Sequence, residues 1–165
     1  MCRYKTYLAQ IEDTLHNTIY PLIEKLKSIN TENISHAKQQ IMSTEAHASS
    51  IYWSYFKQLI PANYNFTHRT HRHSKDPVNS ALNYGYGILY SECFRALTLA
   101  GLDPYAGFLH TLQNNKQSLV FFIEPFRQPL IDTPLLAYIR QGINVQLQKN
   151  GLLEKETQKN SPPFT

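Results

Sequence analysis

The sequence is poor in cysteine. It holds two, Cys2 and Cys93, and no C-x-x-C pair. Zinc ribbons and thioredoxin-like redox sites both need closely spaced cysteine pairs, so the sequence excludes these two classes of protein. Cys93 falls within a predicted helix, where a lone cysteine is expected to be a buried, reduced thiol.

Long apolar runs and several catalytic signatures are also missing. No run reaches the roughly 20 apolar residues that cross a bilayer. The N-terminal residues MCRYKTYLAQIEDTL lack the apolar core of a signal peptide. We therefore expect no membrane segment and a cytoplasmic location. No serine–histidine–aspartate order or glycine-rich phosphate loop stands out, and the absence of a His-Asp dipeptide argues against the helical HD phosphohydrolases.

The composition is that of a folding chain with a modest positive charge. The sequence has 165 residues, of which 42% are hydrophobic, and this is enough for one domain with a real core. Wholesale disorder is excluded by the same fraction. The net charge of +4 permits nucleic-acid binding without establishing it.

Hydrophobic periodicity predicts an all-α protein. Apolar residues recur near a 3.6-residue period over residues 3–29 and 34–59, which predicts two long helices. Pro21 is expected to kink or divide the first of them. A further helix is expected over residues 134–149, ended by Gly151.

The expected domain organisation is simple. We expect one helical domain over residues 1–150. The polar, proline-terminated tail over residues 151–165 is expected to be disordered.

The central helix has clear start and stop signals. Asp76 is a suitable N-cap, and Pro77 fits the first helical position, where its missing N–H costs nothing. Gly101 stands where a C-terminal glycine is expected, and Pro104 prevents the helix from resuming.

A polar stripe runs along this helix. Its members fall at steps of four, three and four residues, which places two amides and two phenols on one face: Asn79, Asn83, Tyr86 and Tyr90. Polar groups on a half-buried helix need partners. The turn that follows is expected to bring His110 nearby.

Glu45 lies on an otherwise apolar stripe of the second predicted helix. Its neighbours at helical spacing are Ile41, Ala48, Tyr52 and Phe56. An ionised carboxylate among apolar side chains is unfavourable unless it is paired or binds a metal. The residues alone leave both interpretations open, a salt bridge to an arginine or a metal ligand.

A polar, basic connection covers residues 61–75. Its arginines and lysine could neutralise DNA phosphates while its aromatic residues stack on bases. The alternative is a solvated loop. Its three histidines match no zinc pattern and are expected at the surface: His68, His71 and His73.

Several motifs together resemble one family. The string N-x-x-L-N-Y-G-Y-G-x-L-Y, followed by A-G-L-D-P-x-x-G-F-L-H, resembles the helical C-terminal domain of the CRISPR-associated endonuclease Cas-one, the integrase of spacer acquisition. E-A-H-A-S-S-I-Y-W resembles the family's E-G-x-A-A-x-x-Y-W, with Ala46 in place of glycine. F-x-x-R-x-x-R and E-P-F-R, with Asp132 beyond it, also fit. The resemblance covers residues 35–145 well.

The resemblance implies a metal-dependent DNA endonuclease and integrase of CRISPR adaptation, part of antiviral defence. It implies Mg²⁺ or Mn²⁺ as cofactor, with Glu45 and His110 as catalytic metal ligands. In the family, a 3′-hydroxyl of captured DNA attacks a phosphodiester of the CRISPR repeat, and water as the nucleophile gives nuclease activity. The implied partners are double-stranded DNA, a second copy of the chain and the small protein Cas-two.

The resemblance also suggests DNA-binding residues. It favours phosphate contact by Arg69 and Arg72. Asn79, Tyr86 and Tyr90 could hydrogen-bond to the DNA backbone or to the ligands. The equally weighted alternative is that these three pair with neighbouring helices.

The chain departs from the family at one metal ligand. The family has an aspartate before E-P-F-R, and it is the third ligand. Counted forward from His110, its position falls on Phe122; counted back from Glu124, it falls on Phe121. The stretch is one residue short. Glu124 is the nearest surviving carboxylate and could rescue the site, although three residues on a helix correspond to about 4.5 Å of rise.

Two functions therefore stay open. Family members usually begin with a small β domain, and nothing in this sequence resembles it. The first hypothesis is a family-type integrase that is catalytically weak or dead. The second is a non-catalytic helical module for DNA binding or assembly.

Overall fold

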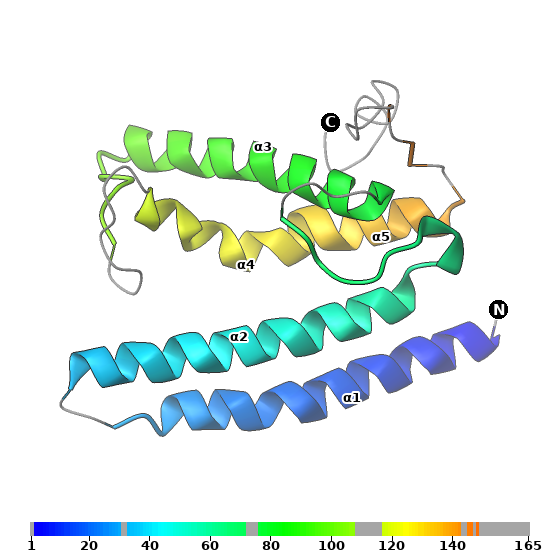
Figure 1. Ribbon diagram of the computed structural model, residues 1–165, viewed down its shortest axis with the longest axis horizontal. Helices are drawn as coiled ribbons and strands as arrows, with labels where there is room; N and C mark the ends of the chain where they lie inside the picture. Colours follow the sequence, from blue (N-terminus) through cyan, green and yellow to red (C-terminus); the bar gives the residue numbers. More distant parts are fainter. Residues whose placement is uncertain are drawn as a thin grey trace. The chain divides into compact units, whose positions relative to one another are not determined.

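The computed structural model (Figure 1) is built of helices. Every regular element that it describes is helical, which confirms the all-α prediction. None of the described helices combines the length and apolar character that a membrane span requires. The described residues are 2–30, 33–71, 76–107, 117–142, 145–146 and 148, with side chains from residue 13 onward.

The chain forms two compact units, Met1–Leu59 and Ile60–Thr165. The first is a hairpin of two long helices that lie side by side, α1 (Cys2–Lys27) and α2 (Ile34–Leu59), as Figure 1 shows. Both helices were predicted from the apolar period. The expectation of one domain over residues 1–150 stays a prediction.

Pro21 does not divide α1, so of the two expected effects division is wrong, and a kink stays a prediction. Proline removes the hydrogen bond to the carbonyl four residues earlier, here that of Asn17. Pro21 and Asn17 are both exposed. Water can therefore satisfy this carbonyl, and the helix continues past the proline.

The second unit pairs one long helix with a run of short ones. After a single 3₁₀ turn, α3 lies alongside the run that contains α4 and α5 (Figure 1). That run changes its winding from 3₁₀ to α to π and back to α. The elements are η1 (Ala62–Tyr64), α3 (Pro77–Leu99), η2 (Ser118–Ile123), α4 (Glu124–Arg127), η3 (Gln128–Asp132) and α5 (Thr133–Arg140).

Both ends of α3 follow the sequence signals. Asp76 Oδ1 accepts a hydrogen bond from the Asn79 backbone N–H at 2.8 Å, and Pro77 occupies the first turn. At the other end Gly101 has φ +72°. The Leu102 N–H donates to the Leu97 carbonyl at 3.0 Å, which completes a Schellman C-cap.

The last helix is shorter than predicted. α5 ends at Arg140, and Gly142 follows at φ +77°, a conformation that favours glycine and stops a helix. Val145 is nevertheless 2% exposed. A residue beyond the helix end can therefore still be buried in the core. Gly151 and the predicted tail lie outside the described residues.

The core of the second unit sits between α3 and the run of short helices. Val78 and Leu82 point inward from α3. They are completely buried, together with Ala81, Val120, Ile123 and Leu135. Burying each large apolar side chain stabilises the fold by about 1.5–3 kcal/mol. This core fixes the first half of α3 against η2 and α5.

Candidate functional site

Asn79 is the centre of a polar network at the start of α3. Its side chain is 1% exposed, yet each of its polar atoms is hydrogen-bonded. The amide nitrogen donates to the His68 carbonyl and to Asp76, both at 2.8 Å. The amide oxygen accepts from Arg69 at 3.0 Å and from the Thr70 N–H at 2.9 Å. Asn79 therefore attaches the preceding segment to the first turn of α3.

Arg69 extends this network along the helix. One guanidinium nitrogen donates to Asn83 Oδ1 at 2.7 Å, and another donates to the Thr70 carbonyl. The guanidinium carbon lies 5.2 Å from the centre of the Tyr86 ring, within cation–π range. Burial lowers the pKa of Arg69, but an arginine stays protonated in a protein. The Arg69 cation is thus held by protein partners.

Tyr86 links α3 to the π-helical segment η3. Its hydroxyl donates to Asp132 Oδ1 at 2.5 Å. Both residues are buried, Tyr86 with 8% and Asp132 with 3% of its surface exposed. Arg127 also lies over the tyrosine ring, 4.8 Å from its centre. Burial, and then the Asp132 charge, raise the pKa of Tyr86 far above its ordinary value. Tyr86 therefore stays a neutral donor, and two guanidinium groups lie near the buried carboxylate.

Tyr90 makes a separate link one turn further on. Its hydroxyl donates to Gln117 Oε1 at 2.6 Å. Burial raises the pKa of Tyr90, which keeps this donor protonated. For Asn79, Tyr86 and Tyr90, the structure shows pairing within the fold, one of the two alternatives that the sequence left open.

Glu124 is already engaged. It begins α4 and forms a 2.6 Å ion pair with Arg127, one turn along the same segment. To bind a metal, the Glu124 carboxylate would have to share its charge with this arginine. The pairing therefore weakens the case for rescue by Glu124.

Glu45 has a different environment. It lies on α2, in the first unit, and it is exposed. No ion pair involving Glu45 occurs among the described residues, so the predicted salt bridge is not seen. Phe56 is buried, whereas the other apolar members of the stripe are only half-buried. The sequence overestimated how apolar this position is.

The remaining predicted site residues can be placed only in part. His110 and Arg72 lie outside the described residues, as does His73. His68 and His71 are exposed, as predicted. Within the described part of the chain, no three histidine, cysteine or acidic side chains come together to hold a metal. The described residues alone therefore do not form a metal site.

Two partners in the network were missed by sequence reasoning. Arg127 and Asp132 were noted only as parts of a motif, and their contacts with Tyr86 were not foreseen. A signal was present, because Asp132 follows the apolar residues of P-L-I and a carboxylate buried there needs a donor. Tyr86 on the polar stripe needed a partner as well.

The fold recurs in solved structures of other proteins. This chain superposes over 95% of its length on 48% of a chain in a partial Cas6-RT-Cas1–Cas2 complex, with a TM-score of 0.77 and 24% sequence identity. It also matches a casposase bound to its integration product, over 85% of this chain and 44% of that one, with a TM-score of 0.62 and 26% identity. The fold is therefore shared with a part of each of these two chains.

The chain belongs to the Cas1 family, the Cas-one family that its motifs resemble. The family model described as CRISPR associated protein Cas1 matches residues 2–160. A CRISPR-associated endonuclease Cas1 of Archaeoglobus fulgidus is 40% identical over 124 residues, which are 71% of this chain and 36% of the relative. One from Pyrobaculum aerophilum is 38% identical over 128 residues, 77% of this chain and 40% of the relative. The chain thus spans about two fifths of the length of these relatives.

Proposed function

We propose that this chain is a metal-dependent DNA endonuclease and integrase of CRISPR spacer acquisition whose catalysis is impaired. Membership of the Cas1 family supports the reaction class. The observation that carries the impairment is the segment before E-P-F-R, where Phe121 and Phe122 stand and a carboxylate ligand is expected. Mg²⁺ or Mn²⁺ is the proposed ion, and Glu45, His110 and, less favourably, Glu124 are its proposed ligands.

The winding of η2 favours one of the two phenylalanines as the equivalent of the missing carboxylate. Six residues of a 3₁₀ helix turn through about 720°, and seven residues of an α-helix turn through about 700°. A 3₁₀ segment can therefore replace an α-helical one that is one residue longer without turning E-P-F-R to another face. The η2 winding is thus a physical means of absorbing the one-residue shortening.

Within this winding, Phe121 is the better equivalent of the missing aspartate. It lies three residues after Ser118, a rise of about 6 Å and one full turn in a 3₁₀ helix. An aspartate four residues after that serine on an α-helix also rises about 6 Å and turns about 400°. Phe122 lies a further third of a turn away and is 67% exposed. Phe121 is half-buried, so the substitution removes a charge and adds an apolar ring at the proposed site.

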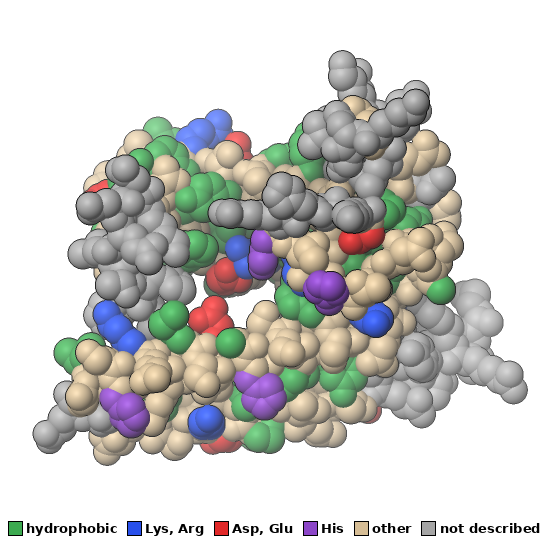
Figure 2. Space-filling view, in the orientation of Figure 1, with side chains coloured by type: hydrophobic (Ala, Val, Ile, Leu, Met, Phe, Trp, Pro, Cys, Tyr) green, Lys and Arg blue, Asp and Glu red, His purple; other side chains and the backbone are tan. Residues whose placement is uncertain are grey.

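We further propose that the chain binds double-stranded DNA and assembles with a second copy and with Cas2. Arg69, Asn79 and Tyr86 would then act on DNA mainly by holding the segment that leads to Arg72, and Tyr90 would act by holding Gln117. This is supported by the inward hydrogen bonds of Arg69 and Asn79. On the face shown in Figure 2, basic side chains are scattered and do not gather in one patch, in keeping with modest electrostatic binding.

A Mn²⁺-dependent cleavage assay on double-stranded DNA tests the impairment. We expect slow cleavage or none by the unsubstituted chain, and no further loss in Glu45→Ala if the site is dead. Efficient cleavage that disappears in Glu45→Ala would overturn the proposed impairment. Glu92→Ala is a matched control, because it also removes one exposed helical carboxylate outside the proposed site.

The second candidate function is a non-catalytic helical module for DNA binding or assembly. The ion pair between Glu124 and Arg127 favours it, because it engages the one carboxylate that could replace the missing ligand. Gel-shift titrations in EDTA separate the two candidates. A module binds DNA or Cas2 equally well with and without Mn²⁺, whereas a metal-dependent enzyme binds its DNA substrate more tightly when Mn²⁺ is present.

A further inference from the structure

A polar pocket lies at the loop end of the α1–α2 hairpin, within the first unit. Its volume is about 540 Å³. None of the described residues that line it is acidic, and only one of them, Ile29, is aliphatic. The others carry amine, imidazole, amide or hydroxyl groups: Lys25, Ser28, Asn30, His36, Gln39, Gln40 and Ser43. The lining therefore suits neither an apolar ligand nor a metal cation.

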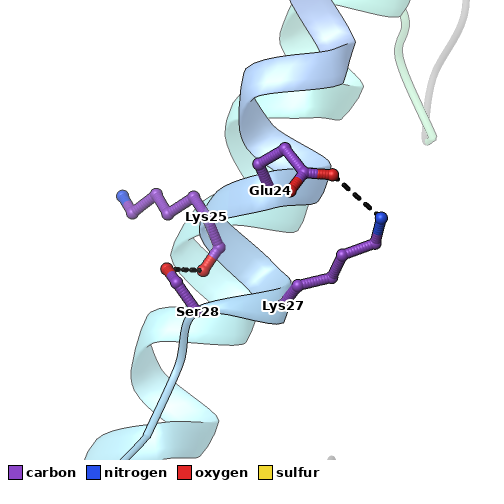
Figure 3. A network of polar contacts seen from close by, with 4 residues as sticks. All are labelled: Glu24, Lys25, Lys27 and Ser28. Atoms are coloured by element: carbon purple, nitrogen blue, oxygen red, sulfur yellow. Dashed lines mark hydrogen bonds and ion pairs between the residues drawn. The ribbon is translucent and has the colours of Figure 1, made fainter.

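Lys25 gives the pocket an unneutralised positive charge. Figure 3 shows that Lys25 and Lys27 leave α1 on different sides. The Lys27 amine forms a 2.8 Å ion pair with Glu24. Lys25 has no ion-pair or hydrogen-bond partner among the described residues. Of these two neighbouring lysines, Lys25 is thus the one available to a ligand.

Three backbone acceptors in the last turn of α1 are already in use. The carbonyls of Glu24 and Leu26 accept from the N–H groups of Ser28 and Ile29, at 3.0 and 3.3 Å. The Lys25 carbonyl accepts from the Ser28 hydroxyl at 2.8 Å, a contact drawn in Figure 3. These bonds offset the negative end of the helix dipole. The groups left to face the pocket are chiefly donors.

Side-chain donors complete the site. The amides of Asn30 and Gln39 have no hydrogen-bond partner among the described residues. The His36 ring is 3.5 Å from the Gln40 amide nitrogen. An ammonium with several amide donors and no carboxylate matches the charge and the hydrogen-bonding capacity of a phosphate group.

We propose that this pocket binds a phosphate group. Free phosphate and the backbone of a DNA strand share this chemistry, and the volume accommodates either one. The inference does not rest on the metal chemistry of the proposed function. A chain without nuclease activity would still have this pocket.

Titration of the ¹⁵N-labelled full chain with inorganic phosphate tests the proposal. We expect saturable shifts of the side-chain amide signals of Asn30, Gln39 and Gln40. Lys25→Gln should weaken the apparent affinity about tenfold, because hydrogen bonds to charged groups are the strong ones. Lys27→Gln is the matched control, since it removes the same charge two residues away, and it should leave the affinity unchanged.

The phosphate titration tests whether the pocket binds phosphate, and a second titration tests where that phosphate comes from. Shifts that do not saturate, or an equal loss of affinity in both variants, would overturn the proposal. The second titration uses a short DNA duplex in chloride buffer. Displacement of phosphate by the duplex, weakened only by Lys25→Gln, supports the proposal with the DNA backbone as the source. A response to free phosphate alone supports it with a small phosphate as the source.

Discussion

The polar motif residues of α2 and α3 differ in their burial and in their bonding to other parts of the fold. On α3, Asn79 and Tyr86 are buried and engaged by partners from other segments. On α2, Glu45 is exposed and makes no ion pair among the described residues. The comparison separates two kinds of motif residue. Those on α3 hold the structure together, whereas Glu45 contributes no ion pair to the described part of the fold.

The largest loss of stability is expected for Asp132→Ala. The change removes the acceptor of the Tyr86 hydroxyl and the buried negative charge that acts on Arg69. Removing one partner of a buried charged network costs about 3–5 kcal/mol. Urea unfolding, followed by circular dichroism, measures this loss. Glu92→Ala, at an exposed ion pair, should change the stability by less than about 0.5 kcal/mol. Equal stability of the two variants would contradict the role given to Asp132.

The second largest loss of stability is expected for Asn79→Ala. It leaves the Thr70 N–H and the His68 carbonyl without their partner, and each unsatisfied buried group costs about 1–3 kcal/mol. We expect the unfolding free energy to fall by about 2–4 kcal/mol, because some of the unpaired groups can form hydrogen bonds with water instead. Asn83→Ala is the comparison from the same stripe, because it removes an amide bonded to Arg69 but leaves the bonds of Asn79 to His68 and Thr70 intact. If both variants lose the same stability, Asn79 is not the centre of the network.

Tyr86→Phe should cost less than either change. The ring that Arg69 and Arg127 contact is kept, and only the hydroxyl bonded to Asp132 is lost. A hydrogen bond to a charged group contributes about 1.5–3 kcal/mol. Thermal unfolding measures the difference, with Tyr90→Phe as control, because the Tyr90 hydroxyl meets a neutral amide. A smaller loss for Tyr86→Phe than for Tyr90→Phe would contradict the assignment.

The smallest effect on stability is expected for Glu45→Gln. The side chain is exposed and unpaired within the described residues, so the unfolding free energy should stay within about 0.5 kcal/mol. If the carboxylate is kept free for a metal, Mn²⁺ binding should nevertheless be lost. A large loss of stability would instead identify Glu45 as a structural residue, and the contrast between α2 and α3 would disappear.

Much of the local structure could be predicted from the sequence, because the signals are local. The bounds of α2 and the caps of α3 follow from the apolar period and from Asp76, Pro77 and Gly101. The end of α5 could not be predicted in the same way. Gly142, at φ +77°, follows the last turn of that helix, whereas the apolar pattern of the sequence runs on beyond it.

The candidate site was predicted only in part, because its contacts are long-range. The polar stripe on α3 indicated that partners were needed. It could not indicate that one of them, Asp132, lies 46 residues after Tyr86. Counting along the chain also left Phe121 and Phe122 equivalent, and the 3₁₀ winding of η2 is what distinguishes them. The environment of Glu45 was misjudged because helical spacing does not reveal how much of a stripe is covered.

Calorimetry with Mn²⁺ on the unsubstituted chain, Phe121→Asp and Phe122→Asp tests the account most directly. We predict weak or undetectable binding by the unsubstituted chain. Phe121→Asp should bind about 10–100-fold more tightly, as expected for a restored ligand, and the gain should vanish when Glu45→Ala is added. Tight binding by the unsubstituted chain, or a gain confined to Phe122→Asp, would contradict the claim that the missing carboxylate at Phe121 impairs this Cas1 family member.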